Sequence, residues 1–185
     1  MSSSRRERSL FLLNFLKNPL RNASIIPSSA TASRTMIRGV DFDKVHTILE
    51  LGPGPGTFTE VLLAHCRPGT RLILIEIEDS YVTLLRQKFG DRVTVVHTSA
   101  HLMGEVLAEQ GIHHADLIIS GLPFLPGEIK TITFDAIRRQ TDMGAIFRYF
   151  TYMPAIMRRV YRGLPVEEKF FVWQNIPPMW IYGIN

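Results

Sequence analysis

The stretch that decides the fold is ELGPGPGT at positions 50–57, which ends a predicted strand over residues 47–51 and opens a predicted helix. Glycines allow the backbone to approach a ligand closely, and the first turn of a helix offers unpaired N–H groups. A dinucleotide-binding fingerprint requires a third glycine at position 57, where Thr57 stands. The loop instead reads E-x-G-x-G-x-G, so Glu50 lies at the strand end, where it can meet a ligand ammonium group.

A second acidic residue follows the loop at the spacing that is typical of α/β nucleotide sites. Glu76 ends the next predicted strand, twenty residues after Gly56. In α/β nucleotide sites a carboxylate at this position accepts hydrogen bonds from the ribose hydroxyls. The alternative interpretation is a tight Gly/Pro turn and a solvated carboxylate. Glu78 and Asp79 are interpreted as acidic residues that stabilise a helix N-terminus. Loop and distal acid together predict a ligand that contains a nucleoside.

Short apolar runs alternate with helical segments through the rest of the chain, which is the pattern of a doubly wound α/β sheet. The predicted strands span residues 47–51, 71–75, 93–97, 116–120, 144–150, 169–174 and 179–182. The predicted helices span residues 57–65, 80–89, 102–110 and 129–140. Only Pro177 and Pro178, and no long helix, separate the last two strands. We therefore expect an antiparallel C-terminal hairpin, which a plain dinucleotide-binding fold lacks.

The composition narrows the class of protein. The chain has 185 residues, of which 45% are hydrophobic and 21% are charged, as in one globular domain. Its single cysteine, Cys66, excludes an internal disulfide and favours a reducing compartment. No Cys/His cluster suggests structural zinc. The longest apolar runs, residues 10–16 and 117–126, are shorter than the ~20 residues that cross a bilayer.

Charge is distributed unevenly along the chain. Residues 1–38 contain seven basic and one acidic side chain, residues 39–129 contain six and twelve, and residues 130–162 contain seven and two. Two basic segments that flank an acidic middle indicate a polyanionic partner, which is either a nucleic acid or an anionic membrane surface. Charge alone does not choose between them.

The basic N-terminus contains an amphipathic pattern. Residues 9–18 place five Phe and Leu side chains on one arc of a helix, which Pro19 ends, and three arginines precede it at positions 5, 6 and 8. This pattern is typical of a helix lying in the membrane plane. A helix that packs on the domain and a short signal peptide are the alternatives. We expect residues 1–38 to dock on the membrane and residues 39–185 to form the catalytic domain.

The glycine loop and the acid after it resemble the motifs of a known family. Residues 48–62 resemble motif I of class I S-adenosylmethionine-dependent methyltransferases, and residues 74–85 resemble their second motif. The resemblance implies a Rossmann-like, doubly wound, seven-stranded sheet that binds S-adenosylmethionine and releases S-adenosylhomocysteine. It implies that the ribose meets Glu76, the adenine meets Ile77, and the methionyl part meets Glu50, Gly52, Gly54 and Gly56. Thr57 and Phe58 are expected as further cofactor contacts.

The triplet that follows the third predicted strand differs from the pattern of that superfamily. The superfamily often has a G-D-A-like triplet whose Asp binds the adenine amino group, whereas this chain has Thr98-Ser99-Ala100. Ser99 can still accept that hydrogen bond, with Ala100 beside it. A membrane-binding scaffold that has lost the chemistry is a further alternative, and this triplet is its support.

A second motif bears on the methyl acceptor. Ser120-Gly121-Leu122-Pro123-Phe124 ends the fourth predicted strand, where amino-directed methyltransferases carry N-P-P-Y or N-L-P-Y. Methyl transfer requires a neutral amine about 3 to 3.5 Å from the methyl carbon. A rigid turn with carbonyl groups facing the amine, beside the aromatic face of Phe124, suits that requirement. A buried turn containing proline is the structural alternative.

Two families share this motif. Ribosomal RNA adenine dimethyltransferases read N-L-P-Y and add a C-terminal helical domain, whereas bacterial phospholipid N-methyltransferases read S-G-L-P. This chain resembles the second family also in FLKNP at 15–19, IPSS at 26–29, Thr151-Tyr152-x-Pro154 and the segment 172–178. The resemblance implies stepwise N-methylation of phosphatidylethanolamine toward phosphatidylcholine. An RNA adenine N6-methyltransferase is the alternative function.

The resemblance also assigns further residues and a location. Ser28 and Ser29 either cap a helix that begins near Ala30 or close over the cofactor. Arg148 and Tyr152 are predicted to meet the lipid phosphate and headgroup, because of their place at the end of the fifth predicted strand, on the side where the cofactor lies. Arginine suits a phosphate because it donates two parallel hydrogen bonds. No histidine is predicted as general base; Tyr152, the Ser120 carbonyl or water accepts the proton. We expect a cytoplasmic enzyme, peripheral on the inner face of a bacterial membrane, with lipid rather than nucleic acid as partner and no metal.

Overall fold

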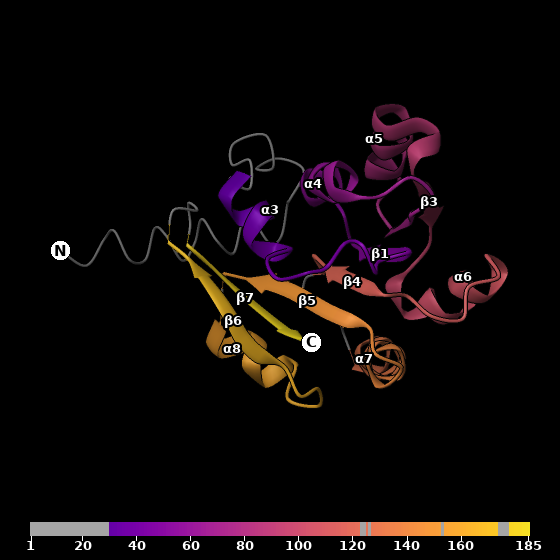
Figure 1. Ribbon diagram of the computed structural model, residues 1–185. Coiled ribbons are helices and arrows are strands. Elements are labelled where there is room, and N and C mark those ends of the chain that lie inside the picture. The colour runs from indigo at the N-terminus through magenta and orange to yellow at the C-terminus, as the bar shows by residue number, and fades with distance from the viewer. Residues whose placement is uncertain (1–29, 123–124, 126, 153, 174–177) are drawn as a thin grey trace.

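The computed structural model describes residues 30–122, 125, 127–152, 154–173 and 178–185. Seven strands form one sheet in the order β3-β2-β1-β4-β5-β7-β6 (Figure 1). The strands are β1 Thr47–Leu51, β2 Arg71–Glu76, β3 Thr94–His97, β4 Leu117–Ser120, β5 Ile146–Thr151, β6 Glu167–Val172 and β7 Met179–Ile184. Strands β1 to β5 are parallel, and β7 is antiparallel to both β5 and β6. The predicted fold class and C-terminal hairpin are confirmed.

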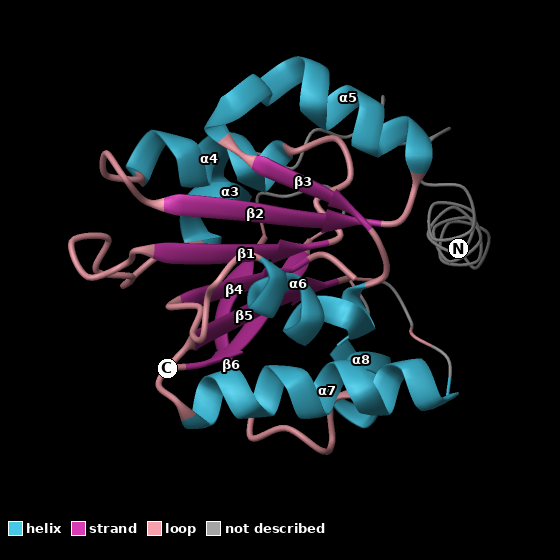
Figure 2. Ribbon diagram, turned by 90° about the vertical axis from the view of Figure 1, so that its right-hand side faces the viewer, coloured by secondary structure: helices cyan, strands magenta, loops and turns pink. Residues whose placement is uncertain are grey.

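Helices cover both faces of the sheet (Figure 2). The helices are α3 Ala30–Met36, α4 Thr57–His65, α5 Asp79–Phe89, α6 Met103–Glu109, α7 Gly127–Asp142 and α8 Pro154–Val160. One core lies between the sheet and α3, α4 and α5, and the other between the sheet and α6, α7 and α8. All residues of β1 and β4 are buried, as expected for parallel strands covered on both sides. The sequence patterns predicted four of these helices and did not predict α8.

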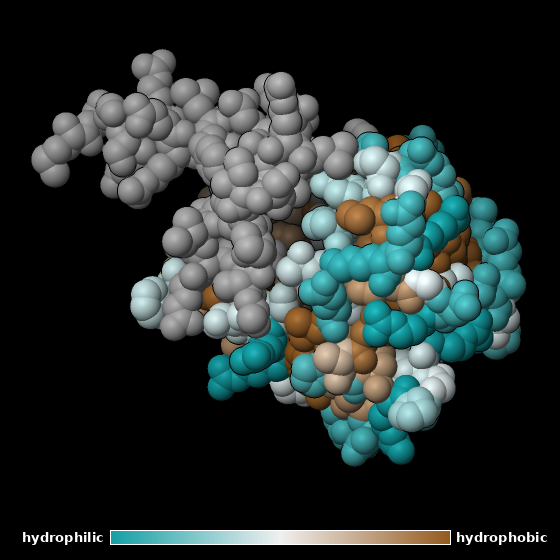
Figure 3. Space-filling view, turned by 90° about the horizontal axis from the view of Figure 1, so that it is seen from above, coloured by the Kyte–Doolittle hydropathy of each residue, from teal (hydrophilic) through white to brown (hydrophobic). Residues whose placement is uncertain are grey.

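The outer surface of the α3, α4 and α5 layer is mixed in polarity. Figure 3 looks onto this side and shows hydrophobic residues as separate patches between hydrophilic ones. None of the helices in the described ranges is long and apolar enough to cross a bilayer.

Helix α3 lies within the predicted docking segment 1–38 but belongs to the core. Ala32 and Met36 have no exposed surface and pack with residues of α4 and β7. Helix α3 begins nine residues before the expected boundary at residue 39, and its buried side chains belong to the core of the sheet. The predicted amphipathic helix at residues 9–18, and Ser28 and Ser29, lie outside the described residues.

The strand order places a binding crevice at a definite position. Strand β1 lies between β2 and β4, so the crossover connections run in opposite directions on its two sides. Ligands of open α/β sheets bind beyond the carboxyl ends of the strands at such a switch point. The glycine loop that follows β1 lies at this point.

Candidate functional site

The glycine loop takes a backbone that other residues rarely adopt. Gly52, Gly54 and Gly56 have φ angles of 65°, 54° and 80°. A Cβ atom on Gly56 would lie 2.6 Å from the ring of Phe89, so this glycine is required for packing of α4 on α5. A Cβ on Gly54 would meet nothing within 4 Å. The open side of Gly54 fits a ligand that passes over the loop.

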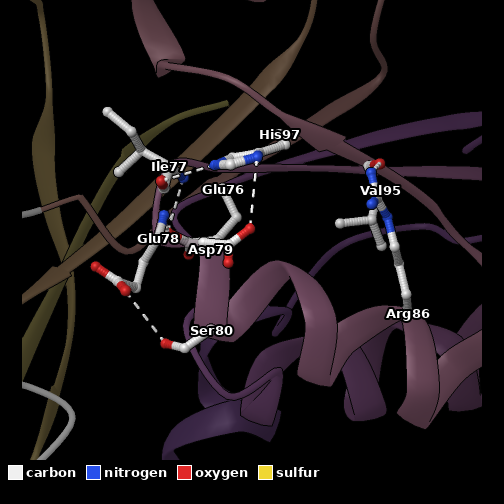
Figure 4. Close-up of polar contacts among 8 residues, drawn as sticks. All are labelled: Glu76, Ile77, Glu78, Asp79, Ser80, Arg86, Val95 and His97. Atoms are coloured by element: carbon white, nitrogen blue, oxygen red, sulfur yellow. Dashed lines mark hydrogen bonds and ion pairs between the residues drawn. The ribbon is translucent and has the colours of Figure 1, made fainter.

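The acid of the second strand is held by the backbone. Glu76 is 6% exposed, and its Oε1 accepts hydrogen bonds from the N–H groups of Ile77 and Glu78 at 2.8 and 2.9 Å (Figure 4). Its Oε2 accepts one from Gly54 N at 3.0 Å. A carboxylate oxygen has two acceptor positions, so Oε2 can accept a further hydrogen bond, as a ribose hydroxyl requires.

A hydrophobic side chain and a histidine complete this corner. Ile77, which is predicted to meet the adenine, is 67% exposed and follows the acid directly. A ring nitrogen of His97 lies 3.1 Å from the carbonyl oxygen of Ile77 and its other nitrogen 3.9 Å from Asp79 (Figure 4). His97 therefore bridges β3 to the turn after β2 and fixes the backbone that presents Ile77.

Glu50 is a buried carboxyl beneath the loop. It is 1% exposed, and its Oε2 accepts a hydrogen bond from the Thr59 hydroxyl at 2.7 Å. Its Oε1 has no partner among the described residues, and burial raises the pKa of Glu50 to about 7. An unpaired buried acceptor beside the loop favours a ligand that brings a donor or a positive charge. Together with the open side of Gly54, this chemistry fits the aminoacyl end of S-adenosylmethionine.

The S-G-L-P segment contacts the glycine loop directly. Gly121 N donates to Leu51 O at 2.8 Å, and a Cβ on Gly121 would lie 2.6 Å from Gly52 O. Ser120 is 1% exposed, and its Oγ accepts a hydrogen bond from Leu122 N at 3.4 Å. The structure thus joins the predicted cofactor loop to the predicted acceptor motif. Pro123 and Phe124 lie outside the described residues.

Phe150, a residue of the predicted strand 144–150, contacts three parts of the candidate site. Its ring lies 5.1 Å from that of Phe58 and 5.8 Å from that of Tyr152, centroid to centroid. A Cβ on Gly121 would lie 3.5 Å from the Phe150 ring. Tyr152 therefore lies at the edge of the sheet that carries the loop, as expected. No sequence signal singles out Phe150, because aromatic residues alternate along β5.

A second missed residue is Tyr161, which follows α8. A hydrogen bond joins its hydroxyl to the side chain of Ser120, and burial raises the pKa of Tyr161 to about 12. Its ring stacks on Tyr149 at 3.9 Å, and Tyr149 is the β5 partner of Ser120. Tyr161 is therefore placed to hold the first residue of the acceptor motif. Only the packing of α8 on the sheet brings the two residues together.

The triplet after β3 lies beside the acid of β2. Thr98 N donates to Glu76 O at 3.1 Å. Ser99 Oγ lies 2.8 Å from His101 Nδ1, and Ala100 is buried at the start of a short 3₁₀ helix, Ala100–Leu102. Ser99 thus has a local hydrogen-bond partner besides the adenine amino group that it is predicted to bind.

The structure corrects the predicted position of Arg148. It is 3% exposed, and its guanidinium donates to the carbonyl oxygens of Phe147 and Ile184 and to the side chain of Asn185. Because β7 is antiparallel to β5, these last residues of the chain lie at the sheet edge opposite the glycine loop. Arg148 therefore anchors the C-terminus and does not face the cofactor side.

No metal site accompanies this arrangement in the part of the chain that the structure describes: no group of three or more His, Cys, Asp or Glu side chains is placed to hold an ion.

The seven-stranded sheet, the glycine loop after β1 and the acid at the end of β2 define a class I S-adenosylmethionine-dependent methyltransferase. Residues 4–124 match the family model for ribosomal RNA adenine dimethylase, and the chain belongs to this methyltransferase family. Membership makes the protein an enzyme whose cofactor is S-adenosylmethionine.

Two kinds of relative match different lengths of the chain. An ornithine lipid N-methyltransferase from Singulisphaera acidiphila is 32% identical, over 94% of this chain and 93% of its own length. A ribosomal RNA small subunit methyltransferase A from Geobacter metallireducens is 43% identical, over 31% of this chain and 21% of its own length.

Solved structures agree on the fold. An O-methyltransferase from Bacillus cereus in complex with S-adenosylhomocysteine has a TM-score of 0.62 and 15% identity, and the match covers 93% of this chain and 91% of that one. Fibrillarin from Aeropyrum pernix has a TM-score of 0.60 and 14% identity, and the match covers 83% of this chain and 74% of that one.

Proposed function

We propose that this methyltransferase transfers methyl groups from S-adenosylmethionine to the amine of a membrane aminolipid, with phosphatidylethanolamine as the expected substrate. The observation that carries the proposal is the extent of the match to the ornithine lipid N-methyltransferase, which covers nearly the whole of both chains. The match to the bacterial ribosomal RNA enzyme covers only a fifth of that enzyme. A match over the full length includes the segments outside the cofactor site, where substrate choice is made.

The residues of the site have distinct tasks in this reaction. The bound cofactor supplies an electrophilic methyl group on a sulfonium. Glu76 and the loop N–H groups hold the cofactor, and Glu50 meets its charged end. Ser120, fixed by Tyr161 and by Leu122 N, starts the turn whose carbonyl groups face the amine. Such positioning accounts for catalysis without a covalent intermediate, because effective concentration alone lowers the barrier substantially.

The amine reacts only when it is neutral, so the site has to accept a proton before each transfer to a protonated amine. Tyr152, half-buried at the end of β5, and the carbonyl group of Ser120 lie on the side of the acceptor. We assign proton acceptance to Tyr152 or to a water molecule that Tyr152 and the Ser120 carbonyl hold. Activity is then expected to rise with pH until the lipid amine is deprotonated in the site.

The test is a transfer assay with labelled S-adenosylmethionine and three acceptors. These are vesicles of phosphatidylethanolamine and phosphatidylglycerol, vesicles in which an ornithine lipid replaces phosphatidylethanolamine, and unmodified small-subunit ribosomal RNA. Label in an aminolipid that Glu76→Gln abolishes supports the proposal, and the two vesicles identify the headgroup. Label in RNA alone would transfer the assignment to the RNA adenine N6-methyltransferase alternative, which the family match favours.

A further inference from the structure

A groove lies between α3 and the edge strand β6, away from the glycine loop. Its volume is about 350 Å³, and its lining consists of Thr31, Thr35, Arg38, Lys169, Phe170, Phe171, Val172 and Trp173. Thr31, Thr35 and Arg38 follow at intervals of four and three residues, so they share one side of α3 and its continuation. The groove therefore has a polar wall from the helix and a largely apolar wall from the strand.

The groove ends at the same sheet edge as the cofactor loop. Val172 of β6 pairs with Met179 of β7, and Trp180 of β7 pairs with Thr151 at the end of β5. Because β5 is parallel to β1, Trp173 lies at the carboxyl edge of the sheet. A surface that binds the groove would also face the edge at which methyl transfer takes place.

Both charged residues of the lining are cations. Arg38 is exposed, its guanidinium carbon lies 5.2 Å from the centre of the Phe170 ring, and no acidic side chain of the described residues pairs with it. Lys169 pairs with Glu167 at 3.2 Å; the lysine side chain is 16% exposed and the glutamate side chain 78%. The Thr35 hydroxyl donates to Thr31 O at 2.6 Å. An exposed guanidinium over a ring, with no acidic partner among the described residues, suits a phosphate diester.

The aromatic residues indicate where that phosphate comes from. Trp173 is 69% exposed and Phe171 is 50% exposed. Both lie where β6 ends, at the carboxyl edge of the sheet. Tryptophan is enriched where proteins meet the bilayer interface, because its ring is apolar and its N–H is polar. A free phosphate would contact only the two cations of the groove. A phospholipid in a bilayer would contact the cations through its phosphate and the exposed aromatic rings through the bilayer interface.

We propose that the α3–β6 groove binds the phosphate group of an anionic phospholipid in the membrane surface and thereby docks the carboxyl edge of the sheet against the bilayer. This inference rests on the proposed function, because it supplies the surface from which an aminolipid reaches the site. It adds a second docking element to the basic N-terminal segment.

The test uses the full chain and two kinds of vesicle, one of phosphatidylcholine alone and one with a third of phosphatidylglycerol. Binding is measured by sedimentation for the wild type, Arg38→Gln, Lys169→Gln and a control, Arg139→Gln. Arg139 is exposed in the last turn of α7, on the other face of the sheet. We expect Arg38→Gln to weaken binding to the anionic vesicles about fivefold, because one cation near such a surface contributes about that factor to the affinity. We expect Arg139→Gln to leave the binding unchanged.

A second measurement locates the contact. Vesicles that contain brominated lipid quench tryptophan emission only at close range, and the chain has two tryptophans, Trp173 and Trp180. We expect strong quenching in the wild type and little in Trp173→Phe. Equal binding by all variants, equal loss in the Arg139→Gln control, or absence of quenching in bound protein would each overturn the proposal.

The same samples separate this proposal from the proposed function. Labelled S-adenosylmethionine added to vesicles that also contain phosphatidylethanolamine reports methyl transfer. If no lipid is labelled while Arg38→Gln still loses binding, the docking role of the groove is supported and the proposed lipid substrate is wrong. If lipid is labelled and Arg38→Gln binds as the wild type does, the groove assignment alone is wrong.

Discussion

The backbone N–H of Gly54 donates a hydrogen bond of 3.0 Å to the side chain of Glu76, which joins the glycine loop after β1 to the acid at the end of β2. Loop and acid are 22 residues apart in the chain and form one unit of the candidate site. We therefore expect a change in the acid to disturb the loop as well as the predicted ribose contact.

Glu76→Gln keeps the shape of the side chain and replaces one acceptor oxygen with a donor. That oxygen faces backbone N–H groups, so the change removes charge-assisted hydrogen bonds that contribute about 1.5 to 3 kcal/mol each. We expect affinity for S-adenosylmethionine, measured by calorimetry, to fall at least tenfold. Glu78→Gln, an exposed neighbour, is the matched control and should bind normally. Normal binding by Glu76→Gln would remove Glu76 from the site.

The carboxyl of Glu50 makes stability depend on pH. Burial raises its pKa in the fold from 4.5 to about 7, so the unfolded chain releases this proton first as pH rises. The free energy of unfolding should therefore fall between pH 4.5 and 7, by up to about 3 kcal/mol from this group, and level off above. Glu50→Gln should lack this decline. Urea unfolding of both proteins at pH 5 and pH 8 measures the difference, and parallel pH profiles would contradict the expectation.

The two loop glycines have separable roles. Gly56→Ala places a methyl group 2.6 Å from Phe89 at a positive φ angle, so we expect a loss of stability of more than about 2 kcal/mol. Gly54→Ala meets no protein atom within 4 Å and should cost only about 1 kcal/mol of backbone strain. It should nevertheless weaken cofactor binding. Thermal melts with and without S-adenosylmethionine distinguish the two effects.

We expect Tyr161 to act through Ser120 as a positioning residue. Tyr161→Phe removes the hydroxyl group that bonds Ser120 and leaves the ring on Tyr149. We expect kcat to fall severalfold with little change in KM for S-adenosylmethionine, and the effect to disappear in a Ser120→Ala background. Tyr182→Phe is the control, because that hydroxyl donates to Glu168 in the same aromatic cluster. Additive losses in the double variant would show that Tyr161 does not act through Ser120.

Arg148→Lys tests the corrected role of that residue. Lysine cannot reproduce the forked hydrogen bonds to the last residues of the chain, so we expect a loss of about 1 to 3 kcal/mol in the free energy of unfolding. The KM for lipid should be unchanged at a temperature where the variant is folded. A raised lipid KM without loss of stability would restore Arg148 to the substrate site.

Local sequence was sufficient to predict that the glycine loop and the acid lie together. Gly52, Gly54, Gly56 and Glu76 could be predicted because the loop and the acid each follow a strand, and parallel strands bring their carboxyl ends to one edge. The limits of local patterns show at Phe150, Tyr161 and Arg148. The aromatic pattern of β5 is the same whichever of its residues lies in the site. Helix α8 has only seven residues, which is too short for hydrophobic periodicity to predict it.

By itself, the sequence determined the class of fold and the cofactor loop, because hydrophobic periodicity and glycine spacing act between near neighbours in the chain. The tertiary structure alone decided which distant side chains meet. Packing of α8 brought Tyr161 to Ser120, the antiparallel return of β7 drew Arg148 to the C-terminus, and the packing of α3 beside β6 formed the groove. Such contacts depend on the register and the layer order of the whole sheet, which no local pattern contains.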